Sequence, residues 1–358
     1  MKIYKILGLM SGTSLDGLDL AYCHIWEEED KWQFDIKKTK SVSYETDMML
    51  KLKDAIQLPS EELLKLHNTY GNWLGIESLK FINEHQLNVD YIASHGHTTH
   101  HRPELGLNFQ IGSGQHLANA SEQKVICDFR TNDLALGGQG APLAPIGDRL
   151  FFKEYDYCLN LGGISNISFE KNGKRIAYDI GLANMVLNYI TRKIGLSYDE
   201  NGNLARKGKI NYSMLNQLNE LEYYKLPYPK SVGYEWFLDK VVPIVQSTSD
   251  TIENLLHTSI HHISDKIAEQ VNFSIMKKKQ TLLITGGGAL NVFFVEILQD
   301  KLGESTSVVI PEKKIIEYKE ALIFALMGVL RVKQKPNILS SVTGAKRDSC
   351  SGVFYHPQ

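Results

Sequence analysis

A glycine-rich turn directly after the first apolar segment constrains this chain more than any other feature. Ile3 to Leu9 predicts a buried strand, and Met10-Ser11-Gly12-Thr13-Ser14-Leu15-Asp16-Gly17 separates it from a second strand over Leu18 to Ile25. About 150 residues further on, Tyr157 to Phe169 repeats the order of strand, glycine turn with polar side chains, and strand. A unit that recurs at this distance predicts two duplicated lobes that face a shared cleft.

The length of 358 residues also fits two lobes better than one hydrophobic core. Predicted strands alternate with predicted helices in both halves, which is typical of α/β layers. We therefore expect an α/β protein with two lobes, duplicated mixed sheets flanked by helices, and a central cleft. The N-terminal lobe is expected over residues 1–147 and the C-terminal lobe over residues 148–358, with the C-terminal tail able to pack back on the N-lobe. Gly137 to Pro142 has little helix or strand propensity and is the expected link between the lobes.

Apolar periodicity and turn residues place the remaining elements. The expected helices are Ser60 to Glu84 with Ser60 as N-cap, Ala183 to Ile194, Val241 to Val271 and Lys319 to Val332. The expected further strands are Tyr91 to Ser94, Val125 to Phe129 and Thr281 to Thr285.

The charge balance and the cysteine pattern argue against several kinds of partner. Lys and Arg number 39 against 41 Asp and Glu, so nothing favours nucleic acid or an anionic membrane surface. No segment has the roughly 18 consecutive apolar residues of a membrane helix, and the N-terminus lacks the features of a secretory signal. The four cysteines form no CxxC pair, which favours reduced thiols and a cytoplasmic protein.

Three glycine turns follow apolar strands, although the common nucleotide-binding motifs are missing. The sequence has no G-x-x-x-x-G-K-[ST] and no H-R-D or D-F-G set of a protein kinase. Backbone N–H groups of a glycine turn can surround a phosphate because no Cβ stands in the way. Such turns are Gly12-Thr13-Ser14, Gly162-Gly163 with Asn166, and Gly286-Gly287-Gly288, the last at the expected start of a helix. One turn alone is better explained as a structural turn, but three together favour phosphate binding.

Acidic residues near these turns are candidates for metal binding and catalysis. Asp16 and Asp19 follow the first turn, where a carboxylate could hold the water shell of Mg²⁺. Asp179 is expected at the end of a strand, before a helix that begins near Ala183, and could act as a general base. A helix cap is the structural alternative for Asp179.

Two further polar segments are candidates for sugar recognition. Ser94 to Arg102 contains four histidines but no Cys or acidic residue at metal-ligand spacing, so a polar sugar-binding loop fits better than a zinc site. Arg130 lies in Asp128-Phe129-Arg130, with Asp133 nearby, and its planar guanidinium could bind a carboxylate. A structural Arg–Asp pair explains Arg130 equally well.

More blocks join these motifs in order along nearly the whole chain. The set comprises Met10 to Gly17, Ser94-His95-Gly96, Gln110-Ile111-Gly112, Asp128-Phe129-Arg130 with Asp133, Gly137 to Leu143, Asn160 to Asn166, Asp199 to Gly202 with Ala205 and Gly208, Pro229-Lys230-Ser231, Glu235-Trp236-Phe237, Gly286-Gly287-Gly288 with Asn291, and Glu320-Ala321 with Phe324-Ala325. Together these blocks closely resemble the signature of the anhydro-N-acetylmuramic acid kinase family. No single glycine turn is specific, but the ordered set is.

The resemblance implies the actin-like ATPase fold of the sugar kinase, heat-shock chaperone and actin superfamily. It also implies a reaction in which ATP, water and 1,6-anhydro-N-acetylmuramic acid give N-acetylmuramic acid 6-phosphate and ADP, in peptidoglycan recycling. Asp179 matches the family's catalytic aspartate, the expected base for the attacking water. Arg130 is the candidate for the lactyl carboxylate of the sugar. The expected cofactors are ATP and Mg²⁺, and the expected partner is a small-molecule amino sugar, with a homodimer left open.

The expected site residues beside the catalytic Asp179 fall into three groups. The nucleotide-binding residues are Gly12, Thr13, Ser14, Leu15, Asp16, Gly17, Leu18, Asp19, Gly162, Gly163, Asn166, Gly286, Gly287 and Gly288. The substrate-binding residues are His95, Thr98, Arg130, Asn184 and Glu320. Asp16 is the expected metal ligand.

At four positions the chain departs from the family pattern. His97 stands where the family usually has Gln, and Asp148 where it has His. Leu182 replaces the usual Pro, and Tyr234 the usual Arg. Leu182 is nearest to Asp179 and bears on the positioning of that carboxylate, whereas the other three bear on substrate contacts or the hinge.

Two alternative functions stay open at the level of sequence. An actin-like kinase of an ordinary amino sugar would use Asp179 to deprotonate a sugar hydroxyl rather than water. A non-catalytic protein that senses a sugar or a nucleotide would keep the fold without turnover, although Asp179, Asp16 and Arg130 speak against it.

Overall fold

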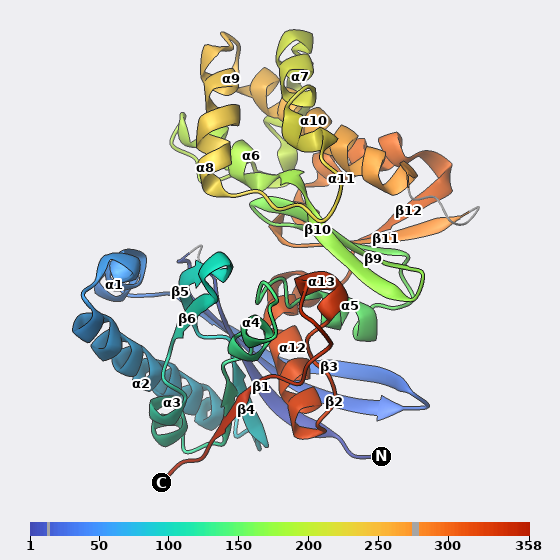
Figure 1. Ribbon diagram of the computed structural model, residues 1–358. Helices are drawn as coiled ribbons and strands as arrows, with labels where there is room; N and C mark the ends of the chain where they lie inside the picture. Colours follow the sequence, from blue (N-terminus) through green and yellow to red (C-terminus); the bar gives the residue numbers. More distant parts are fainter. Residues whose placement is uncertain (13–14, 274–278) are drawn as a thin grey trace. The chain divides into compact units, whose positions relative to one another are not determined.

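The computed structural model describes residues 1–12, 15–273 and 279–358 (Figure 1). These residues form two compact units. Unit 1 comprises Met1–Phe151 and Tyr318–Gln358, and unit 2 comprises Phe152–Glu317. The division after Phe151 lies close to the expected boundary at 147/148, whereas the segment from Tyr318 onward belongs to unit 1.

Unit 1 is built on a mixed sheet of six strands with the order β13-β7-β4-β1-β2-β3. The strands are β1 (Tyr4–Ser11), β2 (Leu18–Glu28), β3 (Lys31–Val42), β4 (Tyr91–Ser94), β7 (Val125–Cys127) and β13 (Val353–Tyr355). β1, β2 and β3 pair in antiparallel fashion, and β4 and β7 extend the sheet in parallel with β1. A separate ribbon pairs β5 (His97–Arg102) with β6 (Leu107–Ile111).

Helices cover both faces of the unit 1 sheet. Successive side chains of β1 point to opposite faces, so each face presents its own residues to a helix. Leu7 and Leu9 belong to a buried apolar cluster with Leu74 of α2 (Ser60–Glu84) and Leu117 of α3 (Gly114–Ser121). On the other face, a Cβ at Gly8 would lie 2.0 Å from the carbonyl oxygen of Ala321. The absence of a side chain at Gly8 therefore lets α12 (Lys313–Val332) pack directly on β1.

The shorter helices of unit 1 lie at the edges of this core. They are α1 (Thr46–Asp54), the 3₁₀ turns η1 (Ala55–Gln57) and η2 (Pro103–Leu105), α4 (Thr131–Ala135), α5 (Pro145–Phe151) and α13 (Ser340–Thr343).

Unit 2 contains a mixed sheet of five strands with the order β10-β9-β8-β11-β12. The strands are β8 (Tyr157–Leu161), β9 (Ile164–Lys171), β10 (Lys174–Leu182), β11 (Gln280–Thr285) and β12 (Thr306–Val309). The helices are α6 (Asn184–Arg192), α7 (Tyr212–Asn219), α8 (Tyr234–Trp236), α9 (Val242–Ser247), α10 (Ile252–Phe273) and α11 (Val292–Leu302). Short turns complete the unit at η3 (Glu200–Gly202), η4 (Ala205–Lys207), η5 (Glu222–Lys225), η7 (Gly287–Leu290) and η8 (Gly303–Ser305), with a π-helical segment η6 (Phe237–Val241).

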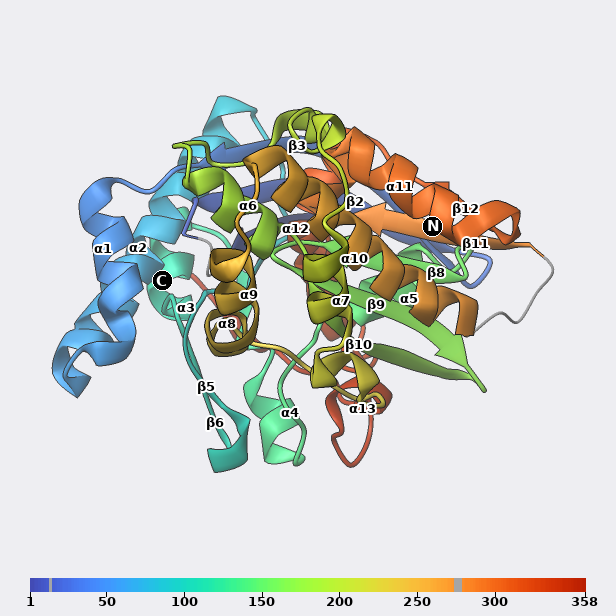
Figure 2. The ribbon, with the colours of Figure 1, turned by 90° about the horizontal axis from the view of Figure 1, so that it is seen from above.

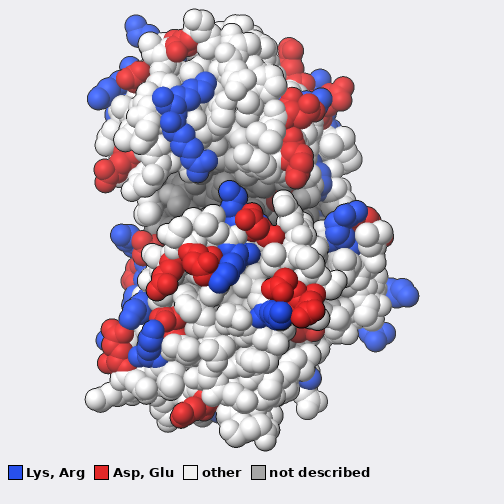
Figure 3. All heavy atoms as spheres, turned by 90° about the vertical axis from the view of Figure 1, so that its left-hand side faces the viewer, with Lys and Arg blue, Asp and Glu red and all other residues white. Residues whose placement is uncertain are grey.

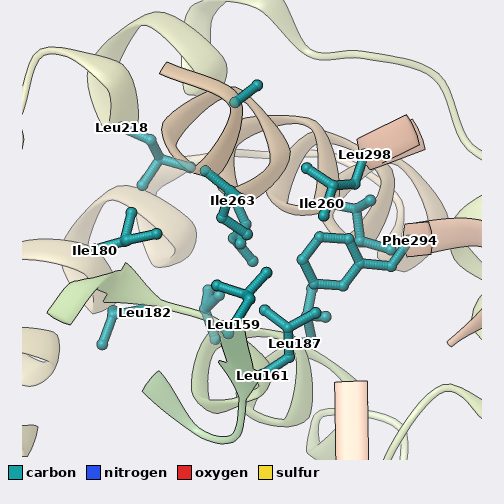
Figure 4. Close-up of a cluster of buried hydrophobic side chains, with 14 of the residues drawn as sticks. Leu159, Leu161, Ile180, Leu182, Leu187, Leu218, Ile260, Ile263, Phe294 and Leu298 are labelled. Carbon is teal, nitrogen blue, oxygen red and sulfur yellow. The ribbon is translucent and has the colours of Figure 1, made fainter. Parts of the chain in front are cut away.

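The core of unit 2 lies between its sheet and its helices. The long helix α10 packs beside α6, α7 and α11 (Figure 2). Ile260 and Ile263 of α10 meet Leu159 and Leu161 of β8 and Phe294 of α11 in a buried cluster (Figure 4). This core fixes the carboxyl end of β8, from which the glycine turn of unit 2 emerges.

The two sheets share one topology, which confirms the predicted duplication. Each begins with three antiparallel strands, β1-β2-β3 in unit 1 and β8-β9-β10 in unit 2. In each, the first of these strands also pairs in parallel with a later strand, β4 or β11. The expected α/β class with mixed sheets flanked by helices is therefore correct.

Some predicted elements agree closely with the structure and others are wrong. α2 and β4 have the predicted bounds, but Ser60 does not cap α2, because it is the first helical residue and the N-cap is Pro59. The predicted helix over Val241 to Val271 is interrupted after Ser247. Asp250 accounts for the interruption, because its carboxylate accepts hydrogen bonds from the backbone N of Thr251 and the side chain of Asn254 at the start of α10.

The segment Gly137 to Pro142 is not the link between the units. It belongs to unit 1, where the side chain of Asp133 accepts a hydrogen bond from the backbone N of Gly140 (2.8 Å). The backbone N of Gln139 donates to the carbonyl oxygen of Thr343 (2.8 Å). Low helix and strand propensity here marks a loop that is held by a buried carboxylate.

On the face drawn in Figure 3, basic and acidic side chains occur on each unit, and neither sign covers that face. No helix within the described part of the chain combines the length and the hydropathy that a membrane crossing requires.

Candidate functional site

The glycine-rich turn of unit 1 connects β1 to β2 as a hairpin. Thr13 and Ser14 lie outside the described residues, so their predicted role is not addressed by the structure. Gly17 has a φ of 151°, and a Cβ there would lie 2.4 Å from the carbonyl oxygen of Val42, so only glycine fits. Leu18 begins β2 and its side chain is fully buried, so only its backbone could contact a nucleotide.

Acidic and basic residues from three elements gather beside this turn. Asp16 is exposed, and Asp19 accepts a hydrogen bond from the Ser41 hydroxyl (2.5 Å). Glu320, on α12, has its pKa raised, first by desolvation and further by Asp19 and Asp16, while Lys319 and Arg130 oppose the shift. These groups therefore lie close enough to share an electrostatic environment.

The residues near the turn fit Mg²⁺ bound through its phosphate ligands rather than a closed protein site. No group of three metal-binding side chains occurs within the described residues. Mg²⁺ usually keeps several waters and takes one or two carboxylates together with phosphate oxygens. The exposed carboxylate of Asp16 suits that arrangement.

Arg130 is held by His95 and by the loop that follows it. Its Nε and Nη2 lie 3.2 and 2.8 Å from His95 Nε2, and its Nη1 donates to the carbonyl oxygen of Gly140 (2.5 Å). Arginine has only donors, so His95 Nε2 must accept and His95 Nδ1–H donates to the carbonyl oxygen of Gly96 (3.0 Å). Burial, the Arg130 charge and His97 hold the pKa of His95 well below its ordinary value, although hydrogen bonds to the backbone oppose the shift.

The alternative of a structural Arg–Asp pair does not describe Arg130. Asp128 accepts from the backbone N and the hydroxyl of Thr131. Asp133 accepts from the backbone N of Gly140 and from the hydroxyl of Thr343. Both carboxylates therefore organise backbone turns, and burial lowers the pKa of Arg130 to about 10.

Asp179 lies within β10 and not at its end, three residues earlier than the strand terminus at Leu182. A β-bulge between Asp179 and Gly181 shifts the register against β9, and such bulges re-aim neighbouring side chains. Oδ2 of Asp179 accepts hydrogen bonds from the Ser231 hydroxyl (2.9 Å) and the backbone N of Val232 (3.1 Å). The carboxylate is therefore oriented through one oxygen.

Asp179 is not a helix cap. The N-cap of α6 is Ala183, and no side chain caps that helix. Desolvation raises the pKa of Asp179, and the hydrogen bonds from Val232 and Ser231 partly oppose this rise. A half-buried carboxylate with a raised pKa and fixed orientation is what a general base requires.

The two predicted glycine turns of unit 2 lie together. A Cβ at Gly286 would come within 2.8 Å of the Leu161 carbonyl group, just before Gly162. Asn184 joins them, since its side chain donates to the carbonyl oxygen of Leu161 (3.0 Å) and its backbone N to that of Gly162 (3.0 Å). Asn166 is paired with Asp179 across β9 and β10, so it lies beside the candidate base.

The prediction that Gly286-Gly287-Gly288 opens a helix needs correction. A 3₁₀ turn, η7, follows Gly286, and α11 begins only at Val292. The side chain of Asn291 caps α11 by accepting from the backbone N of Phe294 (3.0 Å). The glycine turn itself, rather than the N-terminus of α11, is therefore the candidate phosphate site.

Gly286→Ala is expected to destabilise unit 2 by about 2–4 kcal/mol. Gly286 has a φ of 80°, and its Cβ would lie 2.7 Å from Asn160 Oδ1, so strain and overlap add. Gly195→Ala is the matched control, because its φ is 77° but nothing lies within 4 Å of its Cβ. Urea unfolding should show the larger loss for Gly286→Ala; equal losses would mean that the close packing of this turn is unimportant.

The four positions that depart from the family pattern lie in different surroundings. Asp148 pairs with Lys319 (2.7 Å), which ties α5 to α12 inside unit 1. Leu182 is buried at the end of β10, and Tyr234 is 56% exposed. His97 bonds to Ser11, at the end of β1 (3.0 Å).

Ser231 is the site residue whose role sequence reasoning missed. It is 52 positions from Asp179, so no local pattern connects the two. Its only signal was membership of the block Pro229-Lys230-Ser231. Lys230 also contributes, because its carbonyl oxygen accepts from the backbone N of Asp179 (3.1 Å).

Comparison with known proteins shows similarity to one family over nearly the whole chain. The family model of anhydro-N-acetylmuramic acid kinase matches residues 4–357. An anhydro-N-acetylmuramic acid kinase of Aliivibrio fischeri is 34% identical in an alignment of 372 positions, gaps included, which covers 98% of this chain and 99% of the relative. The anhydro-N-acetylmuramic acid kinase of Hydrogenovibrio crunogenus is 31% identical in an alignment of 375 positions, which covers 99% of this chain and 98% of the relative. This chain therefore belongs to the anhydro-N-acetylmuramic acid kinase family.

Proposed function

We propose that this protein phosphorylates 1,6-anhydro-N-acetylmuramic acid with ATP while water opens the anhydro ring. The products are N-acetylmuramic acid 6-phosphate and ADP. Family membership over nearly the whole chain supports this reaction. The observation that carries the mechanism is the oriented carboxylate of Asp179, with its raised pKa. The reaction serves the recycling of cell-wall sugars, and we place it in the cytoplasm.

Asp179 acts as the base for the attacking water. Ser231 and Val232 hold Oδ2, so Oδ1 is the oxygen for the water proton. The water oxygen bonds to C1 of the sugar as the C1–O6 bond breaks, and O6 takes the γ-phosphoryl group of ATP. An ordinary glycosidase needs a second carboxyl group to protonate its leaving oxygen. Here the phosphoryl group takes the place of that proton, so one carboxylate suffices.

The glycine turns hold the nucleotide phosphates. In unit 1, the phosphate-binding candidates are the backbone around Gly12, Leu15 and Gly17 and the Asp16 and Asp19 carboxylates. In unit 2, the candidates are the turns at Gly162-Gly163 and Gly286-Gly287-Gly288. Mg²⁺ bound by Asp16 would neutralise phosphate charge, which is most of what phosphoryl transfer needs from its surroundings.

Arg130 binds the lactyl carboxylate of the sugar. A guanidinium has five N–H donors. The contacts with His95 and Gly140 use one N–H on each of Nε, Nη1 and Nη2, so among the described residues one N–H on each Nη atom has no recorded acceptor. Two such donors match the two oxygens of a carboxylate. His95, Thr98, Asn184 and Glu320 complete the proposed sugar contacts.

Incubation with ATP and either sugar tests the proposed reaction. The anhydro sugar should be phosphorylated efficiently, and N-acetylmuramic acid should react poorly because it has no anhydro ring to open. Efficient turnover of the open sugar alone would instead indicate an ordinary amino-sugar kinase. A homodimer stays a prediction that sedimentation can test.

Ser231→Ala should move the acid limb of the pH–rate profile to higher pH. The base must be ionised, so activity falls as pH falls through the pKa of Asp179, which desolvation already raises. The Ser231 hydroxyl stabilises the ionised form, so its removal raises that pKa further. Profiles of kcat/KM for both proteins, measured under the same buffers, provide the test. An unchanged acid limb would show that Asp179 does not govern it.

A further inference from the structure

The backbone of Asp179 is held from outside the sheet. Among the described strands, β10 lies at an edge of the unit 2 sheet, so its outer N–H and C=O groups need partners other than a strand. One segment supplies both partners: the Tyr223 hydroxyl donates to the carbonyl oxygen of Asp179 (2.8 Å), and the carbonyl oxygen of Lys230 accepts from its backbone N (3.1 Å). Ser231 and Val232 of the same segment bond to the carboxylate. The segment therefore holds both the main chain and the side chain of the proposed base.

These contacts occur where β10 departs from a regular strand, at the β-bulge between Asp179 and Gly181. In a regular strand the ladder fixes the direction of each side chain, whereas a bulge disrupts the ladder and leaves the direction to other contacts. The ring of Tyr224 lies against the other side of the bulge, since a Cβ at Gly181 would lie 2.5 Å from its Cε1. The neighbours Tyr223 and Tyr224 of η5 therefore contact both residues that bound the bulge.

Tyr223 is itself firmly placed. It is 6% exposed, and its ring centroid lies 5.2 Å from that of Trp236 and 4.8 Å from Lys230 Nζ. Lys230 Nζ also donates to the carbonyl oxygen of Tyr223 (3.2 Å), which ties the start of the segment to its end. The pKa of Tyr223 is raised, first by desolvation and next by the charge of Asp179, so the hydroxyl keeps its proton and remains a donor at neutral pH.

We infer that Tyr223 is a positioning residue for the proposed reaction: its hydroxyl fixes the main chain at the bulge and thereby the point at which the Asp179 carboxylate meets the attacking water. The inference rests on the proposed function for the role of Asp179. The action of Tyr223 is indirect, through the base. Misplacement of a reacting group by about 1 Å can cost on the order of 100-fold in rate, so one bond to this backbone has a measurable effect on turnover.

A role in stability alone would have different consequences. If the Tyr223 hydroxyl only satisfied an edge carbonyl group, its removal would reduce the amount of folded protein and leave the rate of each folded molecule unchanged. Positioning predicts instead that the folded enzyme is slower. It also predicts that this loss exists only while Asp179 is present as the base, because the hydroxyl has no other part in the reaction.

Tyr223→Phe tests the inference, because it removes the hydroxyl and keeps the ring with its packing. Tyr22→Phe is the matched control: Tyr22 is 5% exposed, and its hydroxyl also donates to a backbone carbonyl oxygen, that of Asn88 in unit 1 (2.8 Å). Both variants are compared with the wild type, and Tyr223→Phe is repeated in the Asp179→Asn background. The concentration of folded enzyme is taken from the stoichiometry of ADP binding by calorimetry, so unfolded protein does not enter kcat.

Tyr223→Phe should lower kcat for 1,6-anhydro-N-acetylmuramic acid about 10-fold and leave KM within about twofold, since the base acts in the transition state. Tyr22→Phe should leave both constants within about twofold of the wild type. In the Asp179→Asn background, Tyr223→Phe should change the residual kcat by less than about twofold, because the group that it positions is gone. Any loss of folded protein lowers both ratios equally, so their comparison holds even where Tyr223→Phe folds poorly.

Two results would overturn the positioning role while the wild type still phosphorylated the anhydro sugar. One is an unchanged kcat in Tyr223→Phe, and the other is a loss of equal size in the Asp179→Asn background. Turnover of Asp179→Asn at the wild-type rate would remove the base and the positioning role together. No phosphorylation of the anhydro sugar by the wild type would instead overturn the proposed function, and this inference with it.

Discussion

Asp179→Asn should lower kcat by about 10²–10⁴-fold, the range expected for loss of a general base. Asparagine keeps the shape, and its Oδ1 can still accept from Ser231 and Val232. It cannot take a proton from water. Binding of ADP and of the anhydro sugar, measured by calorimetry, should therefore persist while turnover is nearly lost.

The stability of Asp179→Asn should equal or exceed that of the wild type. The folded-state pKa of Asp179 is raised, so protonation of this group favours the fold below the ordinary pKa, and that contribution is lost as pH rises through the raised value. At neutral pH the desolvated, ionised carboxylate lowers the free energy of unfolding, and asparagine removes this penalty. A lower melting temperature would point to a structural role instead.

Asp239→Asn is a matched control in the same unit. The Asp239 side chain is 71% exposed and forms an ion pair with its neighbour Lys240, so this change should leave turnover unaltered. If Asp179→Asn turned over the anhydro sugar like the wild type, Asp179 would not be the base.

Asp148→Ala should destabilise unit 1 by about 3–5 kcal/mol, the loss typical when one partner of a buried ion pair is removed. Asp148 and Lys319 lie 2.7 Å apart, and each side chain is 8% exposed. Removal of the carboxylate leaves the ammonium of Lys319 buried beside Glu320. Since whole domains have only about 5–15 kcal/mol of stability, urea unfolding should show a large shift.

Two further variants test whether the loss of stability comes from burial of the unpaired charge. Asp47→Ala breaks the exposed pair of Asp47 with Lys51 on α1 and should cost less than about 1 kcal/mol. The double variant Asp148→Leu with Lys319→Met removes both buried charges and should be more stable than Asp148→Ala alone. An unfolding midpoint for Asp148→Ala equal to that of Asp47→Ala would contradict the buried-pair account.

Local patterns predicted the elements that carry their own signals. The apolar spacing of α2 and the short apolar run of β4 were sufficient to give their bounds. The break before α10 was missed because the apolar spacing continues across it. The break depends instead on polar contacts of Asp250, whose carboxylate accepts from the backbone N of Thr251. Gly137 to Pro142 was mistaken for a link because propensity cannot show that Asp133 holds it.

The site residues divide in the same way. Glycine turns that follow strands can be found by spacing, and the structure brings those of unit 2 together with Asn184. The contact between Asp179 and Ser231 depends on pairing between distant segments.

The central claim is that one reaction couples attack of water at C1 with phosphorylation of O6. The most direct test is turnover of 1,6-anhydro-N-acetylmuramic acid and ATP in ¹⁸O-labelled water, followed by mass spectrometry of the product. The account predicts one ¹⁸O at C1 of N-acetylmuramic acid 6-phosphate and none in the phosphate group. To prevent later exchange at C1, the product is reduced at once to its alditol. A product without label at C1, or label in the phosphate group, would contradict the account.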